Sequence, residues 1–226
     1  MEERVTIYID GGNFYHLVLK KMGLSEVDFD FDGFANHLAN GRKVIEKGKR
    51  FYIGTVREVV GDERSKELMA RQTELFTELI ARHWEIKTSK LRKRREKLLI
   101  DNRVEDFEKI RAKGIYEVNY TKNREKGIDV KLVTDLFIGA IDNKYDTAII
   151  VSSDTDLVPA IDSVRFRLKR KVEYIGFSIQ DPADPGNPTT PILSMIPKTD
   201  IQRTFIQSEL TPFVKSKQPP LPSARQ

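Results

Sequence analysis

Four aspartates stand where a strand ends or a helix begins, and they are the residues of this sequence best suited to chemistry. Asp10 closes the apolar run 4–10, and Asp154 and Asp156 follow the apolar run 146–153. Asp129 lies at the start of a further apolar run, 128–141. In parallel α/β sheets, ligands bind beyond the carboxyl ends of the strands. Carboxylates gathered there repel one another, and a divalent cation relieves the repulsion. We therefore predict a Mg²⁺ or Mn²⁺ site held by these four side chains.

Each of these aspartates also has an ordinary structural interpretation. Asp10 precedes Gly11 and Gly12 and could only shape a turn. Asp129 and Asp154 could be helix N-caps, which contribute about 1 kcal/mol. Asp156 could complement a helix dipole. Taken singly, each structural role is at least as good an explanation as a catalytic one, so the hypothesis depends on the four acting together.

The elements that must position the aspartates alternate between strands and helices. Strands are predicted at 4–10, 50–58, 84–91, 146–153 and 171–177, where β-branched, aromatic and apolar residues run together. Helices are predicted at 14–22, 28–41, 63–83, 127–141 and 154–168 from their apolar spacing. This alternation predicts an α/β domain with a mostly parallel sheet flanked by helices.

Positive charge is concentrated in residues 87–126, which contain 14 Lys or Arg against 7 Asp or Glu. The whole chain has a formal net charge of +5, so the remaining residues together carry −2. The densest part is the sequence KLRKRR at 90–95. It could be a solvated helix face, or a footprint for a polyanion whose phosphates attract Lys and Arg. We expect this segment to be irregular, with a helix near 95–112 and little base stacking, because it holds few aromatic residues.

Composition excludes several other classes of protein. The 226 residues are 39% hydrophobic and 32% charged, as in a globular protein. No apolar run approaches the roughly 18 residues that a membrane helix needs. Cysteine is absent, which excludes disulfides and thiolate-held metals, and the three histidines are widely spaced. We expect a cytoplasmic protein with no membrane partner.

Towards the C-terminus the composition changes. Residues 180–191 are rich in proline and glycine and predict a loop, and 192–214 are expected to pack as a short helical tail. Residues 215–226 are expected to be disordered or polyproline-like. The predicted organisation is a domain at 1–178 that includes the basic insertion-like segment 87–126, a loop and packed tail at 179–214, and a disordered tail at 215–226.

Three motifs together resemble a known family. They are IYIDGGNFY at 7–15, KGIDVKLVTDL at 126–136 and IIVSSDTDLVPAI at 149–161. In order and spacing they resemble the bacterial NYN-domain proteins of the LabA-like group, within the PIN-like nuclease superfamily. The resemblance covers roughly 4–177, apart from the basic segment. It implies a PIN-like three-layer sandwich and a ribonuclease that depends on Mg²⁺ or Mn²⁺.

The resemblance also implies roles for individual residues. The family's acids fall on Asp10, Asp129, Asp154 and Asp156, and its polar residues fall on Asn13 and Ser152. Ser153 stands where many relatives have glycine, and Leu157 stands where many have an aromatic residue. Asp135 lies about 120° away from Asp129 on an ideal helix, so it is only a weak candidate ligand. The candidate contacts to substrate are Asn13, Ser152, Ser153, Lys126, Lys131, Arg92, Lys93, Arg94 and Arg95.

The expected reaction is in-line hydrolysis of RNA by a metal-activated water, leaving a 3′-hydroxyl and a 5′-phosphate. Endonucleolytic cleavage of single-stranded or structured RNA is the favoured form, and a homodimer and an inhibitor protein are further candidate partners. Two alternatives remain open: an RNA-binding module without catalysis, and a metal-dependent phosphatase acting on a small phosphoester. Gly12 weighs against the phosphatase, because aspartyl-phosphate hydrolases carry a second acid at that position.

Overall fold

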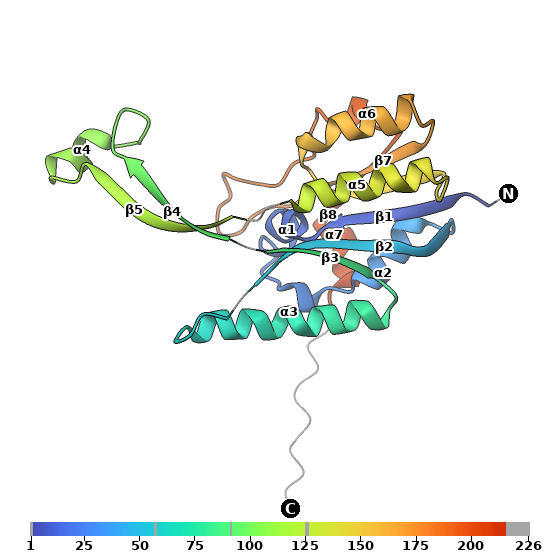
Figure 1. The fold of residues 1–226 in the computed structure, drawn as a ribbon, viewed down its shortest axis with the longest axis horizontal. Coiled ribbons are helices and arrows are strands. Elements are labelled where there is room, and N and C mark those ends of the chain that lie inside the picture. The colour runs from blue at the N-terminus through green and yellow to red at the C-terminus, as the bar shows by residue number, and fades with distance from the viewer. Residues whose placement is uncertain (1, 57, 91, 125–126, 216–226) are drawn as a thin grey trace, which may run out of the picture.

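A parallel sheet forms the centre of the molecule in a computed structural model that describes residues 2–56, 58–90, 92–124 and 127–215. Within these residues the sheet has six strands in the order β3-β2-β1-β6-β7-β8, and every neighbouring pair is parallel (Figure 1). The strands are β1 (Arg4–Asp10), β2 (Lys43–Thr55), β3 (Glu85–Lys90), β6 (Thr147–Val151), β7 (Lys171–Ser178) and β8 (Ile201–Ile206). The predicted α/β class with a parallel central sheet is confirmed.

Helices cover both faces of the sheet. One face carries α5 (Ile128–Ile141) and α6 (Val158–Phe166), with the 3₁₀ turns η3 (Thr155–Leu157) and η4 (Ile196–Lys198). The other carries α1 (Gly11–Phe14), the π-helical turn η1 (Tyr15–Leu19), the 3₁₀ turn η2 (Glu26–Asp28), α2 (Phe31–Ala39), α3 (Glu63–Ala81), α7 (Gln207–Leu210) and the 3₁₀ turn η5 (Thr211–Phe213). Figure 1 shows α5 and α6 on the side of the sheet opposite α3.

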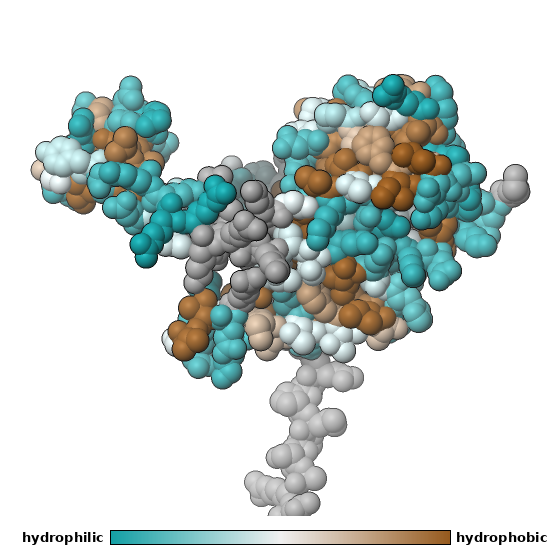
Figure 2. Space-filling view, in the orientation of Figure 1, coloured by the Kyte–Doolittle hydropathy of each residue, from teal (hydrophilic) through white to brown (hydrophobic). Residues whose placement is uncertain are grey.

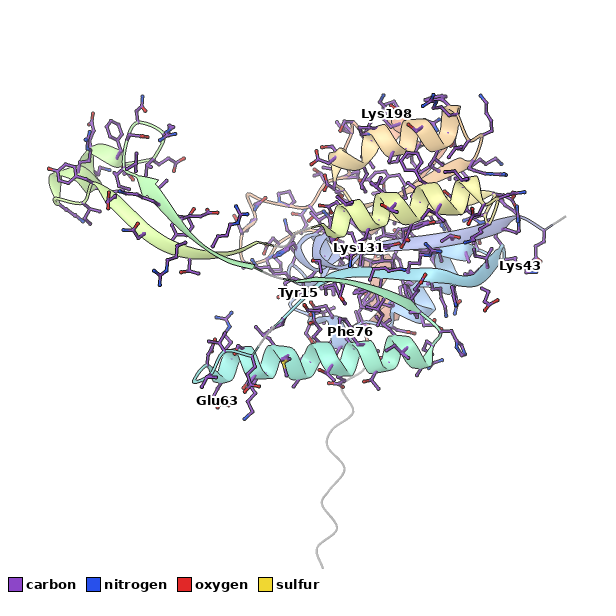
Figure 3. The ribbon with its side chains drawn as sticks, in the orientation of Figure 1. Tyr15, Lys43, Glu63, Phe76, Lys131 and Lys198 are labelled. Atoms are coloured by element: carbon purple, nitrogen blue, oxygen red, sulfur yellow. The ribbon has the colours of Figure 1, made fainter. Side chains whose placement is uncertain are left out.

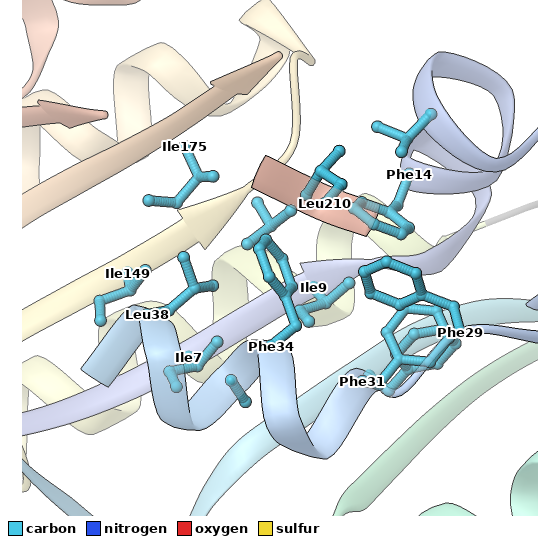
Figure 4. Packing of buried hydrophobic residues seen from close by; sticks show 14 of the residues in the cluster. Ile7, Ile9, Phe14, Phe29, Phe31, Phe34, Leu38, Ile149, Ile175 and Leu210 are labelled. Atoms are coloured by element: carbon cyan, nitrogen blue, oxygen red, sulfur yellow. The ribbon is translucent and has the colours of Figure 1, made fainter. Parts of the chain in front are cut away.

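Alternation along the strands divides the core into two layers. In β1, Ile7 and Ile9 face the α2 side, whereas Tyr8 between them faces α5. The α2 layer is aromatic: Phe14, Phe29, Phe31 and Phe34 pack together with ring centroids 5.1–5.8 Å apart (Figure 4). Burying each such side chain is worth about 1.5–3 kcal/mol, so this layer fixes the sheet against its helices.

An ion pair at the amino end of the sheet holds β1 against β6. The Arg4 guanidinium donates to both carboxylate oxygens of Asp146, at 3.1 and 2.8 Å, and the Arg4 backbone N–H donates to Oδ2 at 2.9 Å. These hydrogen bonds lower the pKa of Asp146 to about 2.

We expect Asp146→Asn to destabilise the protein by no more than about 1 kcal/mol, because the pair is partly exposed. The folded-state pKa lies below the usual value, so the stabilisation is complete above about pH 4 and is lost as the pH falls toward 2. Urea unfolding of wild type and variant at pH 7, 4 and 2.5 measures this. A stability difference that is unchanged at pH 2.5 would contradict the assignment.

The basic segment is an antiparallel β-ribbon, not the irregular segment with a helix near 95–112 that its sequence predicts. β4 (Arg92–Leu99) pairs with β5 (Glu117–Arg124) along its whole length, and the helix α4 is confined to Phe107–Ala112. We call residues 92–124 the arm; it extends away from the sheet (Figure 1). The prediction was wrong because a ribbon is stabilised by pairing between strands some 25 positions apart, which a local pattern does not reveal.

The tail also differs from its prediction. Residues 201–206 form β8, the sixth strand, although 192–214 were expected to be helical. Only Phe205 is buried in this edge strand, so the apolar signal for a strand is weak. Lys215 is described, whereas the rest of the tail predicted to be disordered, 216–226, lies outside the described residues. In the described chain, no helix combines the length and apolar character needed to cross a bilayer.

Candidate active site

The order in which the chain adds strands to the sheet reverses at β1, which has β2 on one side and β6 on the other. Chain segments leave the carboxyl ends of β1 and β6 toward opposite sides, and a ligand crevice is expected at such a point. Asp10 is the last residue of β1, and Ser152 directly follows β6. The Ser152 Oγ donates to Asp10 Oδ2 at 3.3 Å, and both side chains are buried. The two strand ends predicted to meet do meet.

Asp10 also shapes the turn that follows it. Its Oδ1 accepts the backbone N–H of Asn13 at 3.0 Å and thereby caps α1. Gly11 is required in this turn, because a Cβ at that position would lie 2.6 Å from the ring of Phe51. The turn-shaping role of Asp10 is therefore real, and it fixes the orientation of the carboxylate at the edge of the sheet.

Asn13 ties the β1 turn to the β6 turn. Its Oδ1 accepts the backbone N–H of Ser153 at 2.9 Å. The Ser153 Oγ lies 3.4 Å from the hydroxyl of Tyr174, which in turn accepts the backbone N–H of Ile192 at 3.1 Å. Sequence reasoning missed Tyr174, because an aromatic residue inside a strand resembles any core residue.

Asp154 and Asp156 follow in a tight turn. The Ser152 Oγ accepts the backbone N–H of Asp154 at 3.2 Å, and Asp154 Oδ1 accepts that of Asp156 at 2.8 Å, capping η3. The Asp154 side chain is half-buried and that of Asp156 is exposed. Capping thus holds Asp154 in place and leaves the Asp156 carboxylate at the surface.

Asp129 precedes Asp154 and Asp156 in the chain but is electrostatically coupled to both. It lies in the first turn of α5, which Gly127 opens with a φ of +87°. Partial burial and the negative charges of Asp154 and Asp156 raise the pKa of Asp129. Three of the predicted carboxylates therefore share one electrostatic field. Among the described residues, no Lys or Arg forms an ion pair with any of them.

Asp135 lies in a different environment. Its Oδ2 accepts the hydroxyl of Tyr52 at 2.8 Å, and it forms ion pairs with Arg50 at 3.4 Å and Lys87 at 3.7 Å. Burial, reinforced by the Asp135 carboxylate, raises the pKa of Tyr52 far above its usual value, so the phenol keeps its proton and donates it. Asp135 balances the charge of cations on β2 and β3.

The predicted basic contacts are spread over two elements. Lys131 donates from Nζ to the carbonyl of Thr88 at 2.6 Å, which directs it toward β3. Arg94 and Arg95 are exposed on β4, whereas only the backbone of Arg92 and Lys93 is described. Lys126 lies outside the described residues.

The donor set fits a hard divalent cation in its chemistry, because it consists of carboxylate oxygens, and burial together with the charges of Asp154 and Asp156 raises the pKa of Asp129. The four aspartates do not by themselves form a complete metal-binding geometry. Within the described ranges, no three His, Cys, Asp or Glu side chains lie close enough together to hold a metal ion. Asp10 faces Ser152, while Asp129 is coupled to Asp154 and Asp156, so chelation by all four requires side-chain movement.

Comparisons with known proteins bear on the family and the fold of this chain. The profile of the NYN domain matches residues 4–189. A crystal structure of a protein of unknown function from Vibrio parahaemolyticus RIMD 2210633 superposes with a TM-score of 0.50 at 17% sequence identity, covering 90% of this chain and 93% of that one. At that identity the likeness concerns the fold alone. A search of curated proteins finds no match.

Proposed function

This chain belongs to the NYN domain family, a family of nuclease-like proteins, and from that premise we propose that it is a divalent-metal-dependent ribonuclease of the LabA-like group. One observation carries the proposal. At the carboxyl edge of a parallel sheet, partial burial and the negative charges of Asp154 and Asp156 raise the pKa of Asp129, and none of these three carboxylates has an ion-pair partner among the described residues. Such a group of negative charges suits a bound divalent cation.

The residues that would hold Mg²⁺ or Mn²⁺ are Asp129, Asp154 and Asp156, with Asp10 beside them. When bound, the metal supplies an acidified water and stabilises charge on the scissile phosphate. The chain provides the orientation. Ser152 and the Asn13 backbone hold the two oxygens of Asp10, and the Ser153 N–H holds Asn13 Oδ1, which leaves the Asn13 amide group to donate to a phosphate oxygen.

We infer that the arm binds the RNA that flanks the site. Only residue 91 separates β3 from β4, and β5 ends three residues before Gly127, so both ends of the arm lie close in sequence to the carboxyl edge. The register puts Arg92 opposite Arg124 and Arg94 opposite Lys122. Basic residues thus stand at paired positions along the ribbon, and such a density of positive charge in the sequence attracts a polyanion. Figure 2 shows hydrophilic residues along the part of the arm nearer the sheet and apolar ones near its far end.

A cleavage assay on wild-type protein tests the proposed function. A 5′-labelled single-stranded RNA is incubated with Mn²⁺, with Mg²⁺ or with EDTA, and the fragment ladder distinguishes internal from terminal cleavage. Fragments that require metal are the expected result. RNA that is bound but left whole under every metal would replace the proposal with a binding module. Phosphate release from a small ester without RNA cleavage would indicate a phosphatase.

Metal binding is expected to raise the melting temperature through the carboxylate cluster. A ligand at 100 times its Kd stabilises by about 2.7 kcal/mol, or about 5 °C or more for a chain of this size. Asp129→Asn should at least halve this gain and slightly raise the melting temperature of the metal-free protein, because it removes one of the repelling charges. Thermal melts with and without Mn²⁺ measure both effects.

The control for this measurement is Asp142→Asn, at the opposite end of α5, where Asp142 pairs with Lys144 at 3.0 Å. It should keep the full gain. An unchanged Mn²⁺ effect in Asp129→Asn would remove Asp129 from the metal site.

Arg94 and Arg95 are expected to act on RNA through charge. The double change to alanine should weaken binding equally for all sequences and make the dependence of log Kd on log salt shallower by about 1.4, since each phosphate contact on a single strand contributes about 0.7. Fluorescence anisotropy at several salt concentrations measures the slope. Lys109→Ala with Lys113→Ala, which removes the same charge beyond the paired strands, is the matched control. Equal effects of the two double variants would mean that RNA binding depends on the total charge of the arm and not on where its basic residues lie.

A further inference from the structure

Helix α5 carries apolar residues on two sides. The side toward the sheet holds its buried residues, which are Ile128, Leu132, Leu136, Gly139 and Ala140. The outer side holds Val130, Ile138 and Ile141, which are 67%, 45% and 65% exposed, and the partly buried Phe137. A surface helix normally keeps its apolar residues on one face, and a helix that is apolar all round is normally covered on every side. The outer side of α5 is apolar and exposed in the part of the chain that the structure describes.

The outer side of α5 has the residue spacing of a coiled-coil interface. Its residues follow one another at intervals of four, three and four, and they are Val130, Thr134, Phe137 and Ile141. Alternating intervals of three and four are those of the a and d positions of a heptad, which keep one stripe of a helix against a second helix. We call these four residues the α5 seam. A narrow, uncharged stripe of this kind suits another helix better than it suits RNA.

Polar groups do not oppose burial of the α5 seam. The Thr134 hydroxyl donates to the carbonyl of Val130 at 2.7 Å, so it already has a partner inside the helix. Lys131 lies about 100° from Val130 around the helix. Its Nζ donates to the carbonyl of Thr88 at 2.6 Å, toward β3 (Figure 3). Asp129 lies about 100° from Val130 in the other direction, so a helix on the α5 seam need not bury either charge.

The α5 seam is complementary to a second copy of itself. Its intervals read the same in both directions, so an antiparallel pair sets Val130 against Ile141 of the partner subunit and Thr134 against Phe137 of the partner subunit. This direction also brings the positive end of each helix dipole beside the negative end of the other. A surface that meets itself across a two-fold axis is the commonest interface of homo-oligomers. We propose that two copies of this chain form a two-fold dimer through their α5 seams, packed antiparallel.

The size of the surface sets the strength of the dimer. Helix α5 has 14 residues and is therefore about 21 Å long. Phe166, which is 61% exposed, ends the neighbouring helix α6, and Figure 2 shows hydrophobic residues on the face that carries α5. An apolar face of roughly a few hundred Å² marks an interaction site. Two such faces together stay below the roughly 1,200 Å² of a standard interface, so the dimer is reversible, with a Kd on the order of 10 μM.

Sedimentation velocity on the full chain tests the dimer. Between about 1 μM and about 500 μM, the average mass should rise from that of one chain toward that of two. Ile141→Glu puts a charge into the α5 seam of each copy and should raise the Kd about thirtyfold or more. Ile80→Glu on α3 is the matched control, because Ile80 is 63% exposed and Ile141 is 65% exposed, and it should leave the Kd unchanged. Thermal melts at low concentration confirm that both variants fold.

Disulfide cross-linking tests the antiparallel direction, and the chain has no native cysteine. Val130→Cys combined with Ile141→Cys should give a covalent dimer under mild oxidation. Neither single variant should, because the two copies of either position lie about 16 Å apart along the helix pair. The same roughly 16 Å separates the two positions within one chain, which excludes an intrachain disulfide. Ala70→Cys with Ala81→Cys, both exposed on α3 and also 11 positions apart, is the matched control and should give no more covalent dimer than the single variants.

Three outcomes would overturn the proposal. The first is a chain that stays monomeric at about 500 μM, well above the expected Kd. The second is a dimer that Ile141→Glu and Ile80→Glu weaken equally, and the third is a single-cysteine variant that cross-links as fast as the double variant. Each places the contact elsewhere or removes it. All of these measurements are made without RNA or metal, so their failure would leave the proposed nuclease untouched.

Discussion

Asp154→Asn is expected to lower the rate of metal-dependent RNA cleavage by about a thousandfold, which corresponds to about 4 kcal/mol of transition-state stabilisation. Asp154 links both parts of the site. Its backbone N–H donates to the Ser152 Oγ that also contacts Asp10, and its charge acts on Asp129. Asparagine keeps an oxygen that can accept the Asp156 N–H, so the turn is preserved while a ligand charge is lost.

Two measurements separate loss of catalysis from loss of binding. The single-turnover cleavage rate with Mn²⁺ should fall, whereas RNA affinity without metal should stay the same or rise, because one negative charge near the phosphates is removed. Asp142→Asn, at an exposed ion pair away from the site, should leave both unchanged. Wild-type cleavage by Asp154→Asn would show that the carboxylate cluster does not carry the reaction.

Glu173→Ala is expected to destabilise the fold by about 3–5 kcal/mol and to lower the melting temperature by about 10 °C. The Glu173 side chain is 1% exposed, and its two oxygens lie 2.8 Å from Arg42 Nη1 and 2.5 Å from Arg203 Nε. Both arginines also donate to the carbonyl of Leu38 near the end of α2. Without the Glu173 carboxylate, the two guanidinium groups remain close together on the α2 side of the sheet, and no negative charge lies between them.

Thermal and urea unfolding measure this effect. Glu173→Gln keeps an oxygen acceptor and should cost less than the alanine variant, whereas Asp142→Ala, at a pair exposed on both sides, should change stability by less than about 1 kcal/mol. A loss of less than 1 kcal/mol in Glu173→Ala would mean that the arginines are satisfied by the α2 carbonyls alone.

Local pattern was enough to predict most of the elements. Apolar runs in β1, β6 and β7 and apolar spacing in α3 and α5 are signals contained within 5 to 20 neighbouring residues, and each element appears where it was predicted. The convergence of Asp10 with Ser152, and of Asp129 with Asp154, also follows from sequence, because parallel strands bring their carboxyl ends to one edge. The assignment of these residues as metal ligands stays a prediction.

Only the tertiary structure decided the rest, because it depends on contacts between residues far apart in the chain. Residues 92–99 form a ribbon because they pair with 117–124. Residues 201–206 form β8 because they pair with β7 at the edge of the sheet. The contacts of Asp135 with Tyr52 and Arg50 join α5 to β2, and no local pattern in the sequence reveals them. The sequence by itself thus determined most of the elements and the edge of the sheet where Asp10 and Asp154 lie, while pairing between distant segments determined the ribbon, β8 and the partners of Asp135.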